Sequence, residues 1–83
     1  MTSTAAAVDG NDLVSRVRAA QLPPVAVRRR IRRRANASLR DMGLSLGVSP
    51  MTVLRWAQGT TEPRLENAIA YRQLLDALDE ATR

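Results

Sequence analysis

The chain has 83 residues, enough for one small domain, and 45% of them are hydrophobic. It contains neither histidine nor cysteine, so it lacks the side chains from which disulfides, most base–nucleophile pairs and most metal sites are built. We therefore expect no catalytic site, no metal and no cofactor. The formal net charge of +5 comes with 13 basic residues, all of them arginine, and favours an anionic partner.

The N-terminal residues 1–10 are mostly small or polar, and we expect them to form a flexible tail. The next segment, residues 11–20, predicts a short helix that Asn11 or Asp12 could cap. Its apolar side chains at helical spacing are Leu13, Val14, Val17 and Ala20. The two prolines at 23 and 24 then break the helix.

A second helix is predicted over residues 24–35, where Val27, Ile31 and Ala35 are spaced by four along one apolar stripe. Asn36 can adopt the left-handed conformation that ends it. The stripe is surrounded by six arginines, which are Arg28, Arg29, Arg30, Arg32, Arg33 and Arg34. So many like charges within two turns repel one another, and a phosphate-bearing partner would relieve that repulsion. The alternative is a helix face that is simply solvated.

The segment from Ser38 to Gly59 predicts two short helices joined by a tight turn. Ser38 can cap the first helix through its side-chain oxygen, and Asp41 places a negative charge in the first turn. The residues that share its inner face are Leu39, Met42 and Leu46. Gly43 allows a crossing helix to approach closely, although glycine costs about 1 kcal/mol of helix propensity relative to alanine.

The turn and the second helix of this segment carry equally clear signals. Gly47 supplies a left-handed stop, and Val48 is an apolar residue at the corner. Ser49 is an N-cap, and Pro50 fits the first helical position, where its missing N–H costs nothing. The inward-facing residues are Val53 and Trp56, and the helix ends at Gly59.

The last helix is predicted over residues 64–81, after a loop marked by Thr60, Thr61 and Pro63. Its inner face comprises Leu65, Ala68, Ile69, Tyr71, Leu74, Leu75 and Leu78. The leucines at 74, 75 and 78 either close the core of a monomer or form a dimer seam, and the pattern leaves both open. No segment has the pattern of a strand, so the predicted fold class is all-α, a compact bundle of four to five helices.

Residues 38–59 resemble the helix-turn-helix of the Xre family, the lambda-repressor-like and Cro-like DNA-binding domains. Gly43 matches the small residue that the family has in the middle of its first motif helix. Gly47 and Val48 match the family's turn, and residues 49–59 match its S-P-x-T-V-x-x-W-x-x-G pattern. The resemblance covers about residues 23–78, with departures at Asn36, Gly43 and Ala57. It implies a lambda-repressor-like domain over residues 11–83 whose second motif helix enters the major groove of DNA.

The resemblance implies base readout by the exposed early residues of the second motif helix, which are Pro50, Met51, Thr52 and Arg55. Arg55 would bond to guanine O6 and N7, and its alternative role is a phosphate contact. The implied phosphate contacts flank the two motif helices and are Ser38, Arg40, Ser49, Gln58, Thr60, Thr61 and Arg64. The arginine-rich helix adds Arg29, Arg30 and Arg33.

Charge is distributed unevenly along the chain. Residues 28–64 carry nine arginines against Asp41 and Glu62, a net charge of plus seven, whereas residues 65–83 carry minus two. The positive charge therefore surrounds the predicted DNA-reading unit, as expected for phosphate binding.

The sequence thus predicts a sequence-specific regulator of transcription that binds double-stranded DNA, a repressor or a Cro-like protein of a phage or mobile element. Two rival classes are an RNA-binding antitermination protein that uses the helix Arg28–Arg34, and an antitoxin-like protein-interaction module. We expect a cytoplasmic, nucleoid-associated protein with no membrane partner and no small-molecule substrate. A homodimer on DNA is left open.

Overall fold

The computed structural model describes residues 8–83, and no strand is present among them. The elements are a π-helical turn η1 (Val8–Asp12) and five α-helices, α2 (Leu13–Ala19), α3 (Val25–Arg34), α4 (Leu39–Leu46), α5 (Pro50–Gln58) and α6 (Leu65–Ala81). The predicted all-α bundle is therefore confirmed, and the ends of α3, α4, α5 and α6 lie within one residue of their expected positions.

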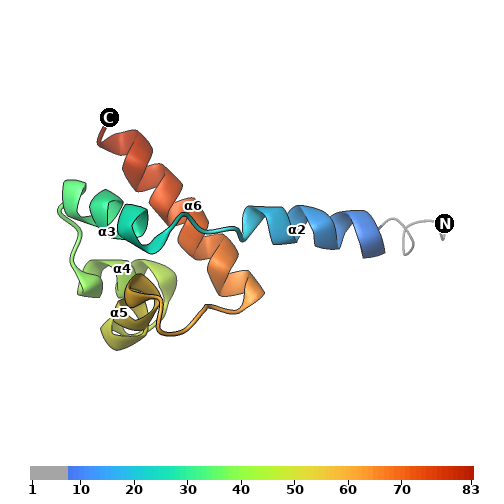
Figure 1. Cartoon of the computed structure of the whole chain (residues 1–83), viewed down its shortest axis with the longest axis horizontal. Coiled ribbons are helices and arrows are strands. Elements are labelled where there is room, and N and C mark those ends of the chain that lie inside the picture. The colour runs from blue at the N-terminus through green and yellow to red at the C-terminus, as the bar shows by residue number, and fades with distance from the viewer. Residues whose placement is uncertain (1–7) are drawn as a thin grey trace.

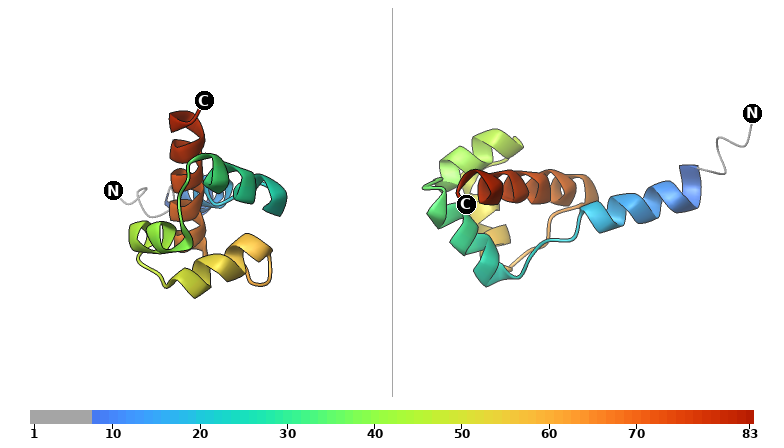
Figure 2. Two further views of the ribbon diagram at one scale, coloured as in Figure 1. Left: turned by 90° about the vertical axis from the view of Figure 1, so that its left-hand side faces the viewer. Right: turned by 90° about the horizontal axis from the view of Figure 1, so that it is seen from above.

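The core lies where α3, α4, α5 and α6 meet (Figures 1 and 2). Its buried side chains come from the apolar stripes of those helices and are Ile31, Met42, Val53, Trp56, Tyr71 and Leu75. The chain's only two aromatic rings, Trp56 and Tyr71, contact each other with centroids 5.5 Å apart and planes tilted by 36°. Such a pair adds about 0.5–1.5 kcal/mol to what its buried area contributes, which ties α5 to α6.

The leucines of α6 close this core. Leu75 has no exposed area, and Leu74 and Leu78 are partly buried and pack against the central cluster. Of the two roles that the sequence left open for these three residues, the structure supports the monomer core over a dimer seam.

The ends of α3 follow the predicted local signals. Pro24 is the N-cap, with φ of −55° and ψ of 153°, and its carbonyl oxygen accepts hydrogen bonds from the N–H groups of Val27 and Arg28. Asn36 follows the helix with φ of +58°, the left-handed conformation that the sequence predicted for it.

The N-terminal helix α2 packs against α6 by its C-terminal part and projects from the bundle (Figures 1 and 2). The guanidinium Nη1 of Arg72 donates a hydrogen bond to the carbonyl oxygen of Arg18 at 2.7 Å. Nη2 of Arg16 lies 3.6 Å from Oε2 of Glu66. These contacts join α2 to the first half of α6.

The start of α2 differs from the prediction. Asp12 has a helical backbone and makes no capping hydrogen bond through its side chain, because η1 leads directly into α2 and no helix end exists there. The expected tail covered residues 1–10; residues 1–7 lie outside the described part of the chain, and residues 8–10 belong to η1.

Candidate nucleic-acid interface

The first motif helix, α4, begins with the predicted cap by Ser38, and Asp41 makes that cap reciprocal. The N–H of Asp41 donates to Oγ of Ser38, and the N–H of Ser38 donates to Oδ2 of Asp41, both at 2.9 Å. The bond from the backbone N–H of Ser38, the Ser38 hydroxyl and the positive charge of Arg40 hold the pKa of the Asp41 carboxyl below its ordinary value of 3.8.

The turn after α4 depends on two glycines. Gly47 has φ of +71°, and the N–H of Val48 donates to the carbonyl oxygen of Gly43 at 3.0 Å. A Cβ added at Gly43 would lie 2.6 Å from the carbonyl oxygen of Val48 and 3.4 Å from the nitrogen of Pro50. The predicted close approach at Gly43 is confirmed, but its neighbour is the backbone of the turn and not the side of a crossing helix.

The second motif helix, α5, is anchored at its start and along its inner face. Oγ of Ser49 accepts a hydrogen bond from the N–H of Thr52 at 3.1 Å, and Pro50 occupies the first turn. Its buried residues are Val53, Trp56 and Ala57. Gly59 follows the helix with φ of +74°, so both predicted ends of α5 are confirmed.

The outer face of α5 is exposed and unengaged. Met51, Arg55 and Gln58 are spaced by four and by three residues, so they share one face, and Pro50 is exposed at its beginning. Met51 is 53% exposed although it is apolar. Among residues 8–83, Arg55 has no partner for a side-chain hydrogen bond or an ion pair. Its guanidinium donors are therefore available to an external acceptor.

Thr52 differs from the other three predicted base readers. It is half-buried, and its Oγ1 lies 2.9 Å from Oγ of Ser49, with either hydroxyl able to donate. Its hydroxyl is therefore engaged in the cap of α5, beside the outer face and not on it.

Exposed polar residues lie at both ends of α5 and at the start of α4. They include every predicted phosphate contact outside α3, namely Ser38, Arg40, Ser49, Gln58, Thr60, Thr61 and Arg64. The loop that carries Thr60 is bonded to the helix, since the N–H of Thr60 donates to the carbonyl oxygen of Arg55 at 2.9 Å. Ser49, Gln58 and Thr60 thus adjoin the ends of α5, whereas Ser38 and Arg40 lie at the start of α4 and Arg64 is the N-cap of α6.

Arg28 is an important residue that the sequence pattern assigned wrongly. The sequence pattern places Arg28 among the solvated or phosphate-binding arginines, but its side chain is buried, with only 8% of the residue exposed. Its Nε donates to the carbonyl oxygen of Pro23 at 2.7 Å, and its Nη1 donates to that of Trp56 at 3.0 Å. Arg28 therefore connects α3 to the segment that precedes it, at Pro23, and to the last turn of α5. Its spacing of three residues from Ile31 placed it on the buried face, and this signal could have identified it.

Two further arginines of α3 are also engaged within the fold. Arg32 donates from Nη1 to the carbonyl oxygen of Ala37 at 3.0 Å, and Arg34 donates from Nη2 to that of Thr82 at 3.0 Å. The Nε of Arg32 is buried without a partner. The run Arg28–Arg34 therefore does not form one continuous free surface, which counts against the RNA-binding alternative.

The exposed arginines of α3 that the sequence singled out are Arg29, Arg30 and Arg33. They lie away from the face of α3 that bonds to α5 through Arg28. Because α3 and α5 meet by their inner faces, their outer faces diverge. The structure does not bring these three arginines together with Arg55.

No group of three or more acidic, histidine or cysteine side chains within residues 8–83 could hold a metal ion. In the same range, none of the helices has both the length and the apolar character that a membrane span needs.

A comparison with protein families finds one match. A family model described as "Helix-turn-helix" matches residues 29–80, which include α4, the turn and α5 and most of α3 and α6. No curated protein and no solved structure matches the chain.

Proposed function

Because this chain belongs to the helix-turn-helix family of Xre and lambda-repressor-like DNA-binding domains, we propose that it is a sequence-specific repressor of transcription. The proposal depends above all on the outer face of α5. That face is exposed, it carries an arginine that has no partner within residues 8–83, and its helix is held by caps at both ends and a buried inner face. A rigid helix with free donors is what direct reading of a major groove requires.

In this proposal Arg55 reads a guanine through O6 and N7, a bidentate contact that discriminates by about 1–3 kcal/mol. Met51 packs on a thymine methyl group, and Pro50 contributes apolar surface at the start of the helix. Thr52 acts chiefly by holding the cap with Ser49, since its hydroxyl is already engaged.

The phosphate contacts come from both ends of α5, from the start of α4 and from the loop that leads to α6. Exposed hydroxyls and amides, with Arg40 and Arg64, position the domain on the duplex without reading sequence. Arg29, Arg30 and Arg33 face away from α5, and in this proposal they act as a source of long-range attraction or contact a flanking phosphate. If about six phosphates are neutralised, the log–log dependence of affinity on salt has a slope near −5.

Repression would result from occlusion of a promoter, in the manner of a Cro-like regulator of a phage or mobile element. This origin is inferred by analogy with the family. Two copies would bind a palindromic operator, with half-sites one helical turn or a multiple of it apart. Such a role places the protein on the nucleoid in the cytoplasm.

The deciding experiment is in vitro selection of duplex DNA by the full chain, followed by affinity measurements on the selected site and a scrambled site. Arg55→Gln should reduce the ratio of specific to non-specific affinity by about tenfold to a hundredfold. Arg64→Gln removes the same charge and serves as the matched control, because it should weaken both affinities equally. Equal losses in both variants would make Arg55 a phosphate contact, and failure to enrich any duplex sequence would refute the proposed function.

A second measurement concerns the helix α3. Replacing Arg29, Arg30 and Arg33 with glutamine should make the salt slope shallower by about one for each phosphate that is no longer neutralised. An unchanged slope would show that none of the three contacts a phosphate.

A further inference from the structure

The outer face of α3 is a basic surface that the proposed DNA-reading helix does not use. One exposed stripe of this helix comprises Ala26, Arg29, Arg30 and Arg33, since the arginines follow Ala26 by three, four and seven residues. The three arginines, here called the arginine stripe, make no ion pair and no side-chain hydrogen bond within residues 8–83, where the ion pairs use other arginines. Three guanidinium groups therefore stand free within little more than one helical turn.

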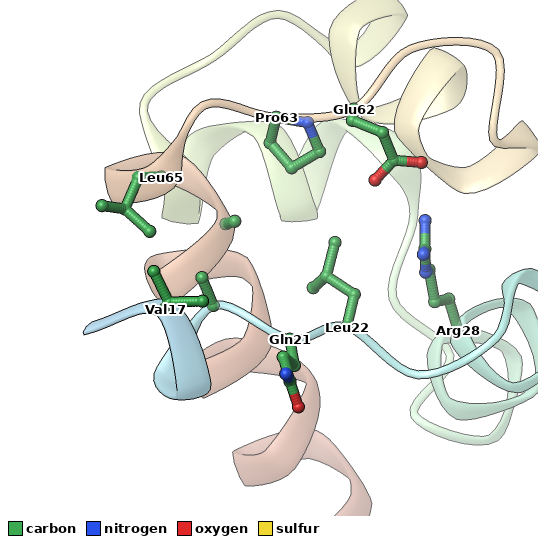
Figure 3. Close-up of a pocket in the computed structure, with 9 residues that line it drawn as sticks. Val17, Gln21, Leu22, Arg28, Glu62, Pro63 and Leu65 are labelled. Carbon is green, nitrogen blue, oxygen red and sulfur yellow. The ribbon is translucent and has the colours of Figure 1, made fainter. Parts of the chain in front are cut away.

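The opposite side of α3 is bonded into the molecule. Arg28 donates to the carbonyl oxygen of Trp56 in α5. Figure 3 shows the same side chain turned toward Glu62, at one end of an open groove of about 620 Å³ between the end of α2, the following linker and the start of α6. At about 100° per residue, the middle of the arginine stripe lies roughly 150° around the helix from Arg28. The stripe therefore points away from the side on which Arg28 and Ile31 are buried.

The outer faces of α3 and α5 look to different sides of the bundle. In Figure 1 and in the left view of Figure 2, α3 lies above α5. Packed helices have axes about 8–10 Å apart and diameters of about 10 Å, so outer faces on opposite sides of such a pair are about 20 Å apart. A straight duplex that takes α5 into its major groove therefore leaves the arginine stripe free on another side of the molecule.

We propose that the arginine stripe binds the phosphate backbone of a second DNA duplex while α5 reads the first, so that one copy of this chain bridges two segments of DNA. The inference rests on the proposed function for the segment that α5 occupies. The second contact is independent of sequence, because guanidinium groups that bond to phosphate oxygens do not read bases. It also weakens with salt, as every contact that releases counterions from DNA does.

The composition of this surface favours a duplex over other anionic partners. Protein interfaces depend on aromatic or aliphatic anchors in a core depleted of charge, and the stripe offers only Ala26 beside its arginines. Single-stranded nucleic acids bind to aromatic platforms, and the chain's two aromatic residues, Trp56 and Tyr71, are buried. A duplex needs neither, because it presents about one phosphate charge per 1.7 Å of axis, and guanidinium forks fit phosphate oxygens in pairs.

Three phosphate contacts are weak by themselves, but two segments of one DNA molecule are tethered to each other. The tether raises the effective concentration of the second segment, so a weak contact can still be occupied. Phosphates also relieve the repulsion among neighbouring arginines on α3. Under this inference, the shallower salt slope of the variant that lacks the stripe appears on DNA long enough to reach α3 a second time, and not on a short duplex that α5 alone can hold.

The test is a capture experiment with the full chain. A short immobilised duplex that carries the selected site is saturated with protein and washed, and a labelled duplex without the site is then added at about 50 mM salt. The wild type should capture the labelled duplex. The triple variant with Arg29→Gln, Arg30→Gln and Arg33→Gln should capture it at least about tenfold less, while its affinity for the short duplex stays within about twofold of the wild type.

The matched control is a second triple variant, with Arg16→Gln, Arg18→Gln and Arg83→Gln. It removes the same net charge from α2 and from the C-terminal residue and leaves α3 unchanged, so capture should persist. Circular dichroism should show the same melting temperature for the α3 variant as for the wild type, because its three altered side chains are exposed and make no bond within residues 8–83.

The possible outcomes separate the bridge from its alternatives. A wild type that captures nothing, capture that survives in the α3 variant, or an equal loss in the control would overturn the bridge. A fall in affinity of the α3 variant for the short duplex that matches its loss of capture would place the arginines on the same duplex as α5. Stronger capture of double-stranded RNA, or of an acidic protein, than of DNA would also overturn it. Failure of the proposed function appears at the first step, as protein that the selected duplex does not retain, whereas retention without capture refutes only the bridge.

Discussion

The buried arginine of α3 permits a sharp test of how α5 is held in place. In Arg28→Met, the aliphatic part of the side chain is largely kept while both hydrogen bonds are removed, one to the carbonyl oxygen of Pro23 and one to that of Trp56. Trp56 retains one partner, because the N–H of Gly59 also donates to its carbonyl oxygen at 3.1 Å. The change therefore removes two charge-assisted bonds and leaves Pro23 as the less satisfied acceptor.

The magnitude follows from opposing effects. Hydrogen bonds from a charged group contribute about 1.5 kcal/mol each at the low end of the usual range, so two of them contribute about 3 kcal/mol. Removing a buried charge returns part of the desolvation cost, about 1 kcal/mol. The net loss is about 2 kcal/mol, a large fraction of the roughly 5 kcal/mol expected for so small a domain. It corresponds to a fall in Tm of about 10 °C.

The assay is urea and thermal denaturation followed by far-ultraviolet circular dichroism. Arg29→Met is the matched control, because it removes the same charge from the neighbouring exposed position and should change stability by less than about 0.5 kcal/mol. Arg28→Lys should fall between the two, since a single ammonium cannot repeat the two-pronged contact. Equal stability of the Arg28→Met and Arg29→Met variants would refute the linking role of Arg28.

Three further outcomes are expected. Gly43→Ala should destabilise the domain by about 1 kcal/mol net, since displacing the backbone at Val48 costs about 2 kcal/mol and helix propensity returns about 1 kcal/mol; a more stable variant in urea would show that the turn yields freely. Burial raises the pKa of Tyr71 above its ordinary value of 10.0, so stability should be fully present below pH 10.0 and fall as the pH rises through the folded-state pKa. Tyr71→Phe should abolish that alkaline decline, and a decline of the same size in the variant would assign it elsewhere. Because the cap holds the pKa of Asp41 below 3.8, its contribution is present above that value and lost as the pH falls through the lower folded-state pKa. Asp41→Asn should therefore make acid unfolding less steep, and an unchanged acid limb would contradict the role of the cap.

Local chemistry explains why the helices of this chain could be located from sequence. Ser38 and Ser49 cap helices by bonding to groups three residues away, and Asn36, Gly47 and Gly59 end helices through their own backbone conformation. Such contacts need only a few neighbouring residues, so they can be recognised before any packing is known. The spacing of apolar residues then decided which face of each helix turned inward.

The candidate site was predictable to a lesser degree. The exposed positions of Arg55 and Met51 follow from the helical period, and the structure places both on the outer face of α5. The engagement of Thr52 with Ser49 is compatible with their spacing, but it competes with any contact to DNA, and only the side-chain geometry reveals it. Whether these residues read bases stays a prediction.

The sequence by itself determined the helices, the caps of α4 and α5, the tight turn and the family, because each depends on residues close together in the chain. The tertiary structure decided which arginines are free: Arg28 and Arg29 are adjacent and chemically identical, yet one bonds to the backbone of α5 and the other faces solvent. It also decided that α2 leaves an apolar face uncovered beside an open groove. Both depend on segments that are distant in the chain and meet only when the bundle packs, which no local pattern encodes.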